Sequence, residues 1–382
     1  MTVRGSHRRR ALAAIALCAS LGWPAARAAV PLDPAGKIKL LGDFTLRLVG
    51  DWDSQDAMEV PRDDRNRARV RGRLGLEFTP QSWITFGARI QTGREGNQRS
   101  AFSTILSSDN AGSEELDVFA NRYYVAAQSG RVWGWAGRNS FTFWKQNELF
   151  WDDDATLAGG TAGWRHAWGS HKFEAAGGYY TLPDGMTHFI ANMAAGQVVY
   201  DRSQDADGFT VAAGFYSFFG EHGALFLLDG NGARDYRIGV VSGQWRLAAG
   251  RIPLSLGADW MRNFKDYSDT DPDLFTAAHH DETDGWAVTA TAGRLKQKGD
   301  WLGSWTWTRI EALAVNASFG QDDYFRWGNP DQTTSSDYEG HELRGGWKPH
   351  DAVTILGRLY RAESITTPED GKRFRLDFIY EF

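Results

Sequence analysis

The feature that most constrains the fold of this chain is the strict alternation of residue types in its last segment, 373–382. Successive side chains of a β-strand point to opposite faces, so alternate residues share a face. One face carries an apolar set: Phe374, Leu376, Phe378, Tyr380 and Phe382. The other face carries a mainly charged set: Arg373, Arg375, Asp377, Ile379 and Glu381. The pattern predicts a strand with one apolar and one polar side.

A second segment, 67–78, alternates in the same way. Its apolar face carries Ala68, Val70, Leu74, Leu76 and Phe78, and its polar face carries Arg67, Arg69, Arg71 and Arg73. Four arginines in register are compatible with the solvated face of a soluble sheet. In a barrel that spans a membrane they would have to face the lumen, because water at that depth is found only there.

The chain begins with the features of a secretory signal peptide. A basic head with four arginines precedes the mostly apolar run 11–21, and Ala26-Arg27-Ala28 supplies the small-x-small cleavage pattern. We expect cleavage after Ala28, which makes residues 1–28 a signal peptide and residues 29–382 the mature barrel. The only cysteine, Cys18, lies within the signal, and Leu17 before it argues against a lipoprotein. The mature chain would then have no disulfide.

Composition narrows the class further. No stretch after residue 28 approaches the 18 apolar residues that a membrane helix requires. The 382 residues nevertheless include 17 Trp, 22 Phe, 12 Tyr and 43 Gly, a content typical of a membrane barrel with aromatic girdles. Cleavage would leave 37 basic against 48 acidic residues, a net charge of −11, which argues against nucleic-acid binding.

The same alternation along the whole chain predicts an all-β fold: one transmembrane antiparallel up-and-down β-barrel of sixteen strands. The predicted strands are 37–50, 67–79, 83–92, 116–127, 131–138, 161–168, 172–181, 192–201, 208–218, 235–247, 252–263, 285–295, 301–313, 338–347, 352–362 and 373–382. Short links alternate with long polar ones, as expected of periplasmic turns and outer loops. The long links are 51–66, 93–115, 139–160, 219–234, 264–284 and 314–337.

A barrel of this size is too wide to be filled by the side chains of its strands, so it leaves an aqueous channel. Alternation assigns ten arginines of the first three and last three strands to the lumen: Arg47, Arg67, Arg69, Arg71, Arg73, Arg89, Arg344, Arg358, Arg373 and Arg375. Because closure pairs the last strand with the first, we expect these arginines to form one continuous basic wall. Glu77, Glu342 and Asp377 reduce its charge without cancelling it.

The third long loop, 139–160, is expected to fold into the barrel. Trp144, Phe150 and Trp151 make it too apolar to remain in water, so these side chains would be buried against the wall. Its acids would then face the arginines across a narrow gap: Glu148, Asp152, Asp153 and Asp154. Opposed rows of charge are one way in which pores select solutes. The alternative is an external loop whose charges are simply solvated.

Several runs resemble motifs of the putative porin family of Gram-negative bacteria. Gly137-Arg138-Asn139 is followed by Phe143-Trp144, by the run 150–154 and by Gly159, which is similar to a strand end leading into a Trp-Asp-x-Asp loop in that family. The run 305–312, followed by Asp322-Asp323, is similar to the family's thirteenth-strand region. The resemblance implies a channel and names no solute.

From these features we expect passive diffusion of small hydrophilic, mainly anionic solutes, without catalytic residues, cofactors or a resident metal. The expected partners are outer-membrane lipid and lipopolysaccharide, the barrel-assembly machinery through Phe382, and the solutes themselves, with a homotrimer as one assembly to test. The final Phe382 on an aromatic strand resembles the signature that this machinery reads.

Three other functions stay open at this stage. The arginine lining would also suit export of an anionic polysaccharide, as in alginate-export barrels. A third loop that closes the lumen would leave a structural barrel, and an outer-membrane enzyme would need an adjacent nucleophile and base, for which the nine histidines offer little.

Asp269, Asp271 and Asp273 alternate as calcium ligands do, but Leu274 stands where such a loop requires glycine.

Overall fold

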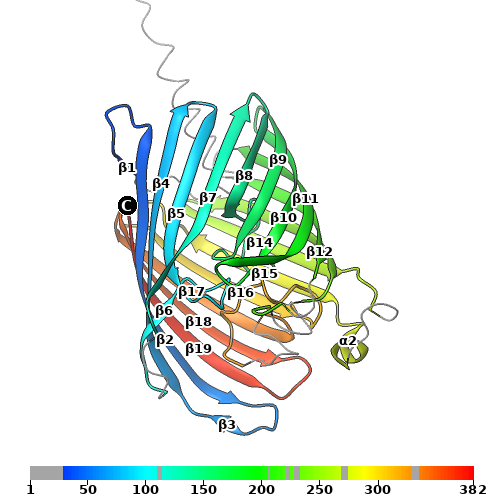
Figure 1. Cartoon of the computed structure of the whole chain (residues 1–382). Helices are drawn as coiled ribbons and strands as arrows, with labels where there is room; N and C mark the ends of the chain where they lie inside the picture. Colours follow the sequence, from blue (N-terminus) through cyan, green and yellow to red (C-terminus); the bar gives the residue numbers. More distant parts are fainter. Residues whose placement is uncertain are drawn as a thin grey trace, which may run out of the picture.

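The computed structural model describes residues 29–109, 114–204, 207–220, 224–227, 233–267, 274–327 and 335–382. Sixteen long strands within these ranges pair antiparallel with their neighbours and form a closed barrel (Figure 1). They are β2 (Ile38–Gln55), β4 (Arg65–Gln81), β5 (Ile84–Gly93), β7 (Asp117–Ser129), β8 (Val132–Ser140), β9 (Thr156–Trp168), β10 (His171–Asp184), β11 (His188–Gln204), β12 (Asp207–Phe219), β13 (Tyr236–Ala249), β14 (Ile252–Asn263), β15 (Asp284–Gly293), β16 (Trp301–Ile310), β17 (Tyr338–His350), β18 (Val353–Ser364) and β19 (Asp370–Glu381). The predicted all-β barrel of sixteen strands is confirmed.

The barrel closes where β19 pairs with β2, from Asp370↔Gln55 to Glu381↔Asp43. In Figure 1 the red strands β18 and β19 lie beside the blue strand β2. Closure satisfies the backbone hydrogen bonds of two strands that would otherwise be edges, as a sheet surrounded by hydrocarbon requires. Phe382 continues the pairing, because its backbone exchanges hydrogen bonds of 2.9 and 3.0 Å with Gly42.

The predicted and observed strands differ mainly at their ends. The strand predicted over 301–313 stops at Ile310, because the chain turns into the barrel there. The link predicted over 93–115 contains a short strand, β6 (Ser103–Ser107), which pairs with the first part of β4. Two further short strands, β1 (Val30–Pro31) and β3 (Pro61–Arg62), pair with β2, and helix α2 (Leu274–His279) lies between β14 and β15.

Two expectations concern residues outside the described ranges. The signal peptide, 1–28, precedes the first described residue. The alternating carboxylates Asp269, Asp271 and Asp273 fall in the gap between 267 and 274. Both expectations therefore remain predictions.

The two faces of the barrel wall have opposite character. On β2 the outward residues Phe44 and Leu48 are exposed, whereas Asp43, Thr45 and Asp51 are buried on the inward face. The same outward apolar pattern recurs around the barrel at Leu74, Leu76, Phe78, Val211, Phe215, Trp245, Trp305 and Trp347. An apolar exterior with a polar interior is the arrangement that lets a barrel face lipid outside and water inside. Among the described residues, no helix is long and apolar enough to cross a membrane.

One side of the interior is filled by an aromatic core. The inward faces of β10, β12 and β13 contribute Tyr180, Tyr216, Phe218 and Tyr236, all buried. They pack against loop residues that enter the barrel: Phe143, Leu149, Phe150, Trp151 and Phe319. We refer to this side as the aromatic half. The opposite side, formed by β17–β19, β2, β4 and β5, carries the predicted arginines and is the basic wall.

Candidate functional site: a charged cavity between the basic wall and three inward segments

Two directly paired glycines, Gly137 of β8 and Gly159 of β9, lie three residues inside the strand ends that flank the third loop. Their φ angles are 120° and 155°, a region that side chains strongly disfavour. A side chain at either position would also meet a neighbouring backbone carbonyl. The adjacent Arg138 is buried and donates hydrogen bonds to three acceptors: Thr156 Oγ1 (2.8 Å), Ala120 O (3.1 Å) and Met186 O (2.8 Å). The base of the loop is thereby fixed.

Beyond this base the third loop runs inside the barrel. Trp151 is fully buried and stacks between Phe141 and Phe319, each at a ring-centroid distance of 5.0 Å. Phe150 is buried against Tyr216, at a centroid distance of 4.5 Å. Trp144, which we expected to be buried with them, is only half-buried. The aromatic side chains therefore hold the loop to the aromatic half of the interior and not to the basic wall.

Two more segments lie inside the barrel, and the sequence analysis placed neither of them there. One is the 94–102 segment after β5, in which Phe102 is buried. The other is the 311–325 segment after β16, in which Ala312–Val315 and Phe319 are fully buried. The signal for the second was its apolar run 312–315, which is unsuited to an external loop.

The three inward segments are joined through the 311–325 segment. Arg99 donates hydrogen bonds to the carbonyl oxygens of Ala317 (2.7 Å) and Gly320 (3.2 Å). On the third-loop side, the Asp152 amide donates to Phe319 O (2.7 Å) and the Gln321 amide donates to Glu148 O (3.1 Å). The segments therefore form one connected body inside the barrel.

A cavity of about 630 Å³ remains between this body and the basic wall. Its lining includes these predicted arginines: Arg47, Arg69, Arg71, Arg73, Arg89, Arg344, Arg358 and Arg375. It also includes the four predicted acids of the third loop: Glu148, Asp152, Asp153 and Asp154. Arg67 and Arg373 do not line the cavity. Their guanidinium groups contact Asp51 at 3.6 and 2.6 Å.

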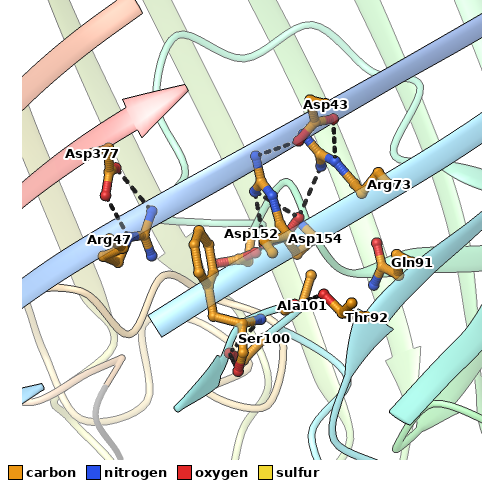
Figure 2. Close-up of polar contacts among 12 residues, drawn as sticks. Asp43, Arg47, Arg73, Gln91, Thr92, Ser100, Ala101, Asp152, Asp154 and Asp377 are labelled. Carbon is orange, nitrogen blue, oxygen red and sulfur yellow. Dashed lines mark hydrogen bonds and ion pairs between the residues drawn. The ribbon is translucent and has the colours of Figure 1, made fainter. Parts of the chain in front are cut away.

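Much of the wall's charge is paired. Arg73 lies between two carboxylates, with Nε 2.7 Å from Asp43 and Nη1 3.2 Å from Asp154 (Figure 2). Arg71 contacts the same two carboxylates at 3.2 and 3.5 Å. Arg47 donates to Asp377 through Nε (2.7 Å) and Nη2 (3.0 Å) (Figure 2). Charge-assisted contacts of this kind fix the side chains of the wall.

The sequence analysis missed two of these wall acids, Asp43 and Asp51. Both have the same parity as Arg47 on β2, so alternation alone could have placed them in the lumen. The wall is therefore a lattice of arginines and acids, less basic than the ten arginines suggest.

A row of arginines crosses the last three strands. Arg344 of β17 is directly opposite Arg358 of β18, which is opposite Arg375 of β19. Like charges in direct cross-strand register are destabilising unless a counter-charge is supplied. Glu342 contacts Arg344 at 3.0 Å. The second counter-charge is Asp323 of the 311–325 segment, which contacts Arg358 at 3.3 Å and Arg375 more closely.

Asp323 was not among the predicted site residues, although the pair Asp322-Asp323 is part of the porin-like motif. Burial opposes the ionisation of Asp323, but the guanidinium groups of Arg375 and Arg358 outweigh it and hold the pKa of this carboxyl far below its usual range. These two guanidinium groups thus favour the ionised form of Asp323 inside the barrel.

The third-loop acids differ from one another. Asp153 contacts Lys145 Nζ at 2.6 Å, and Asp154 contacts the wall as described above. Glu148 has no ion pair among the described residues, and Asp152 accepts a hydrogen bond from the Asp154 amide at 2.7 Å. Burial, followed by the charge of Glu148, raises the pKa of Asp152 well above its usual value. Burial and the charge of Asp153 likewise raise the pKa of Glu148. Glu148 and Asp152, which form no ion pair with a cation among the described residues, are therefore protonated more readily than ordinary acids.

Two arginines of the cavity lining have only neutral partners within the described part of the chain. Arg69 donates to Ser100 Oγ and to Phe102 O, both at 2.9 Å. Arg89 donates to Asn121 Oδ1 at 3.0 Å and to Gln91. The Phe102 ring lies beside Arg69, Arg71 and Arg47, with the Arg47 guanidinium carbon 3.6 Å from its centroid. Arg69 and Arg89 thus differ from the other predicted arginines of the cavity, which contact carboxylates or lie in the row described above.

Comparison with known proteins agrees with the fold. Residues 37–211 match the model of a family described as putative porins. The high-pH structure of Pseudomonas putida OprB is 11% identical, with a TM-score of 0.58 over 91% of this chain and 94% of that chain. OmpT of Vibrio cholerae in its trimer form is 8% identical (TM-score 0.53, covering 90% and 99%). Salmonella typhi OmpF in complex with daunomycin is 10% identical (TM-score 0.53, covering 90% and 97%). No curated protein matches the chain in sequence. The family match covers 175 of the 382 residues, and together with the closed sixteen-stranded barrel it makes this chain similar to the putative porins.

Proposed function

We propose that the protein is a porin of the bacterial outer membrane whose cavity lets small hydrophilic solutes diffuse through the barrel and favours anionic ones. The match of residues 37–211 to the putative porin family and the closed barrel support the channel. The same observations favour a channel over the outer-membrane enzyme. The preference for anions rests on the charges of the cavity.

The observation that carries the anion preference is the contrast between Arg69 and Arg89 on one side and Glu148 and Asp152 on the other. The two arginines have neutral hydrogen-bond partners, and a guanidinium group stays protonated at neutral pH. The two acids are buried beside other acids, which favours their protonated forms. Most other charges at the cavity are paired, so the remaining field attracts anions.

A solute would enter from the long-loop side, pass between the basic wall and the three inward segments, and leave at the short-turn side. Arg69 would meet it first and Arg89 later, since Arg89 lies opposite Gly75, six residues beyond Arg69 on β4. Phe102, between Arg47 and Arg69, would provide an apolar surface beside these charges. The three connected segments favour small solutes over an anionic polysaccharide, because they occupy the space that a polymer would need.

Conductance of the purified barrel in a planar bilayer tests the proposal. Under a salt gradient, the wild-type reversal potential should indicate anion preference, and the double variant Arg69→Gln/Arg89→Gln should reduce it. Arg262→Gln is the matched control, because Arg262 is an exposed arginine on β14 paired with Asp284 at 3.2 Å and does not line the cavity.

Cation preference of the wild type, or equal shifts in the double variant and the control, would contradict the anion proposal while leaving the channel. A folded, heat-modifiable barrel that conducts no ions would contradict the channel itself. That outcome would favour a structural barrel closed by its inward segments.

We also propose that residues 1–28 are removed as a signal peptide, that residues 29–382 form one barrel domain, and that Phe382 is presented to the barrel-assembly machinery. The first is tested by N-terminal sequencing of protein taken from outer membranes, and a start at Ala29 is the expected result.

A homotrimer is proposed from the trimer form of OmpT. Crosslinking in membranes should then yield dimers and trimers and no larger species.

A further inference from the structure

The arginine row of β17–β19 contains more hydrogen-bond donors than its partners use. Arg375 is 3% exposed, and the Nε atoms of Arg358 and Arg375 are both buried without a hydrogen-bond partner. Buried guanidinium donors without acceptors are costly, so a site that retains them is suited to a further acceptor. Arg47 lies on β2 beside this row, where it pairs with Asp377, the residue two positions after Arg375.

The present occupant of the row is supplied by the chain itself. Asp323 projects its carboxylate between Arg358 and Arg375, and it also accepts a hydrogen bond from Gln321 Nε2 at 3.1 Å. The backbone of the same segment is held separately, since Arg373 donates to the carbonyl oxygens of Asp323 (2.8 Å) and Asp322 (3.3 Å). The side chain can therefore leave the row while the backbone stays anchored.

We propose that the row Arg344–Arg358–Arg375, together with Arg47, is a carboxylate-binding site of the channel, and that Asp323 is its built-in occupant, displaced by the carboxylate of an entering solute. The site suits a carboxylate because one already binds there, and planar guanidinium groups match that group in geometry. This inference rests on the proposed function and extends it to the chemistry of the solute.

An internal occupant has a consequence for transport. A tethered carboxylate competes at a high effective concentration, in the millimolar range for short flexible tethers, so it weakens the binding of any solute. Conduction requires sites that bind well enough to admit a solute and weakly enough to release it. Asp323 would therefore keep the residence time short in a row that would otherwise retain anions.

The test compares Asp323→Asn with Asp322→Asn. The two changes remove the same charge from neighbouring residues of one segment, and both side chains line the cavity. Asp322 contacts Arg99 at 3.9 Å and does not contact the row. Citrate is the probe, and its block of the chloride current is measured in planar bilayers. Asp323→Asn should be blocked at citrate concentrations at least about tenfold lower than the wild type, whereas Asp322→Asn and Asp323→Glu should resemble the wild type.

Equal sensitivity to citrate in Asp323→Asn and Asp322→Asn, with a conducting wild type, would overturn the inference and leave the proposed function intact. A wild type that does not conduct would overturn the proposed function. In that case the row is still tested by the temperature at which the barrel unfolds on a gel. Citrate should raise it for Asp323→Asn more than for Asp322→Asn, and no difference would overturn the inference.

Discussion

The two halves of the barrel interior are held in different ways. In the aromatic half, Trp151 and Phe150 of the third loop pack against rings from β12 and the 311–325 segment, and the contacts are apolar and close. On the basic wall, arginines are joined to acids by ion pairs. Packing is non-directional and excludes water, whereas charge-assisted ion pairs are directional and their partners can be exchanged for the charged groups of a solute. The aromatic half can therefore hold the inward segments in place while the basic wall selects the solute.

The largest effect is expected from removing the main anchor of the aromatic half. Trp151→Ala deletes a fully buried ring that stacks on two others, and a change of this type typically costs about 3–5 kcal/mol. The third loop should loosen, single-channel conductance should increase, and current noise should rise. Trp347→Ala, at an exposed outward position, is the control. Unchanged conductance in Trp151→Ala would mean that the aromatic half does not hold the loop.

The next effect concerns the contact between the halves. Asp154 is the third-loop acid that contacts both Arg71 and Arg73. Asp154→Asn should release positive charge into the cavity and move the reversal potential towards the anion value. Asp153→Asn removes the same charge from an acid that contacts Lys145 instead. A smaller shift of the reversal potential in Asp153→Asn would support the role of the contact between Asp154 and the basic wall. Equal shifts in the two variants would contradict it.

Acidification should produce a smaller shift in the same direction. The pKa values of Asp152 and Glu148 are raised, so both carboxyls take up protons at a higher pH than ordinary acids as the pH falls. Asp323, whose pKa is lowered, stays ionised throughout that range. Protonation of these two carboxyls removes negative charge from the cavity. The anion preference should therefore begin to increase while the pH is still above the range in which ordinary carboxyls titrate. The reversal potential of Asp152→Asn measured over the same range should depend less on pH, and an equal dependence would contradict the assignment.

The smallest effect is expected outside the barrel. Arg309 and Glu339 form a partly exposed pair at 3.1 Å that does not line the cavity. Arg309→Gln should change stability by about 0–1 kcal/mol and leave the reversal potential at the wild-type value. A clear change in the reversal potential would show that charges on the outer surface of the barrel, and not only those on its inner wall, determine the ion selectivity.

The strands of this barrel were predictable because each obeys a period of two. Alternation located all sixteen, and it also separated Arg69 and Arg71, which line the cavity, from the outward Leu74 and Leu76. The same rule places Asp43 and Asp51 on the inward face, because both have the parity of Arg47 on β2. Errors arose at strand ends, as at Ile310, where the chain turns inward without a break in apolar character.

The inward segments were harder to predict. The third loop was recognisable from its Trp and Phe content, but the pairing of Asp323 with Arg358 and Arg375 joins residues 35 and 52 positions apart in sequence. Such contacts depend on where a loop packs, and no local periodicity encodes that. Phe102 illustrates the same limit, since a single aromatic residue in a polar loop gives no sign that it will lie beside three guanidinium groups.

The pairing of β19 with β2 also determines when this protein can complete its folding. The strands that meet there are separated by more than 300 residues, so the seam forms only after the whole chain has been made. Contacts between such distant residues are slow to form, and until then two unpaired strand edges are open to other chains. A chain truncated before β19 should therefore be lost as aggregate or degraded, and not persist as a smaller barrel.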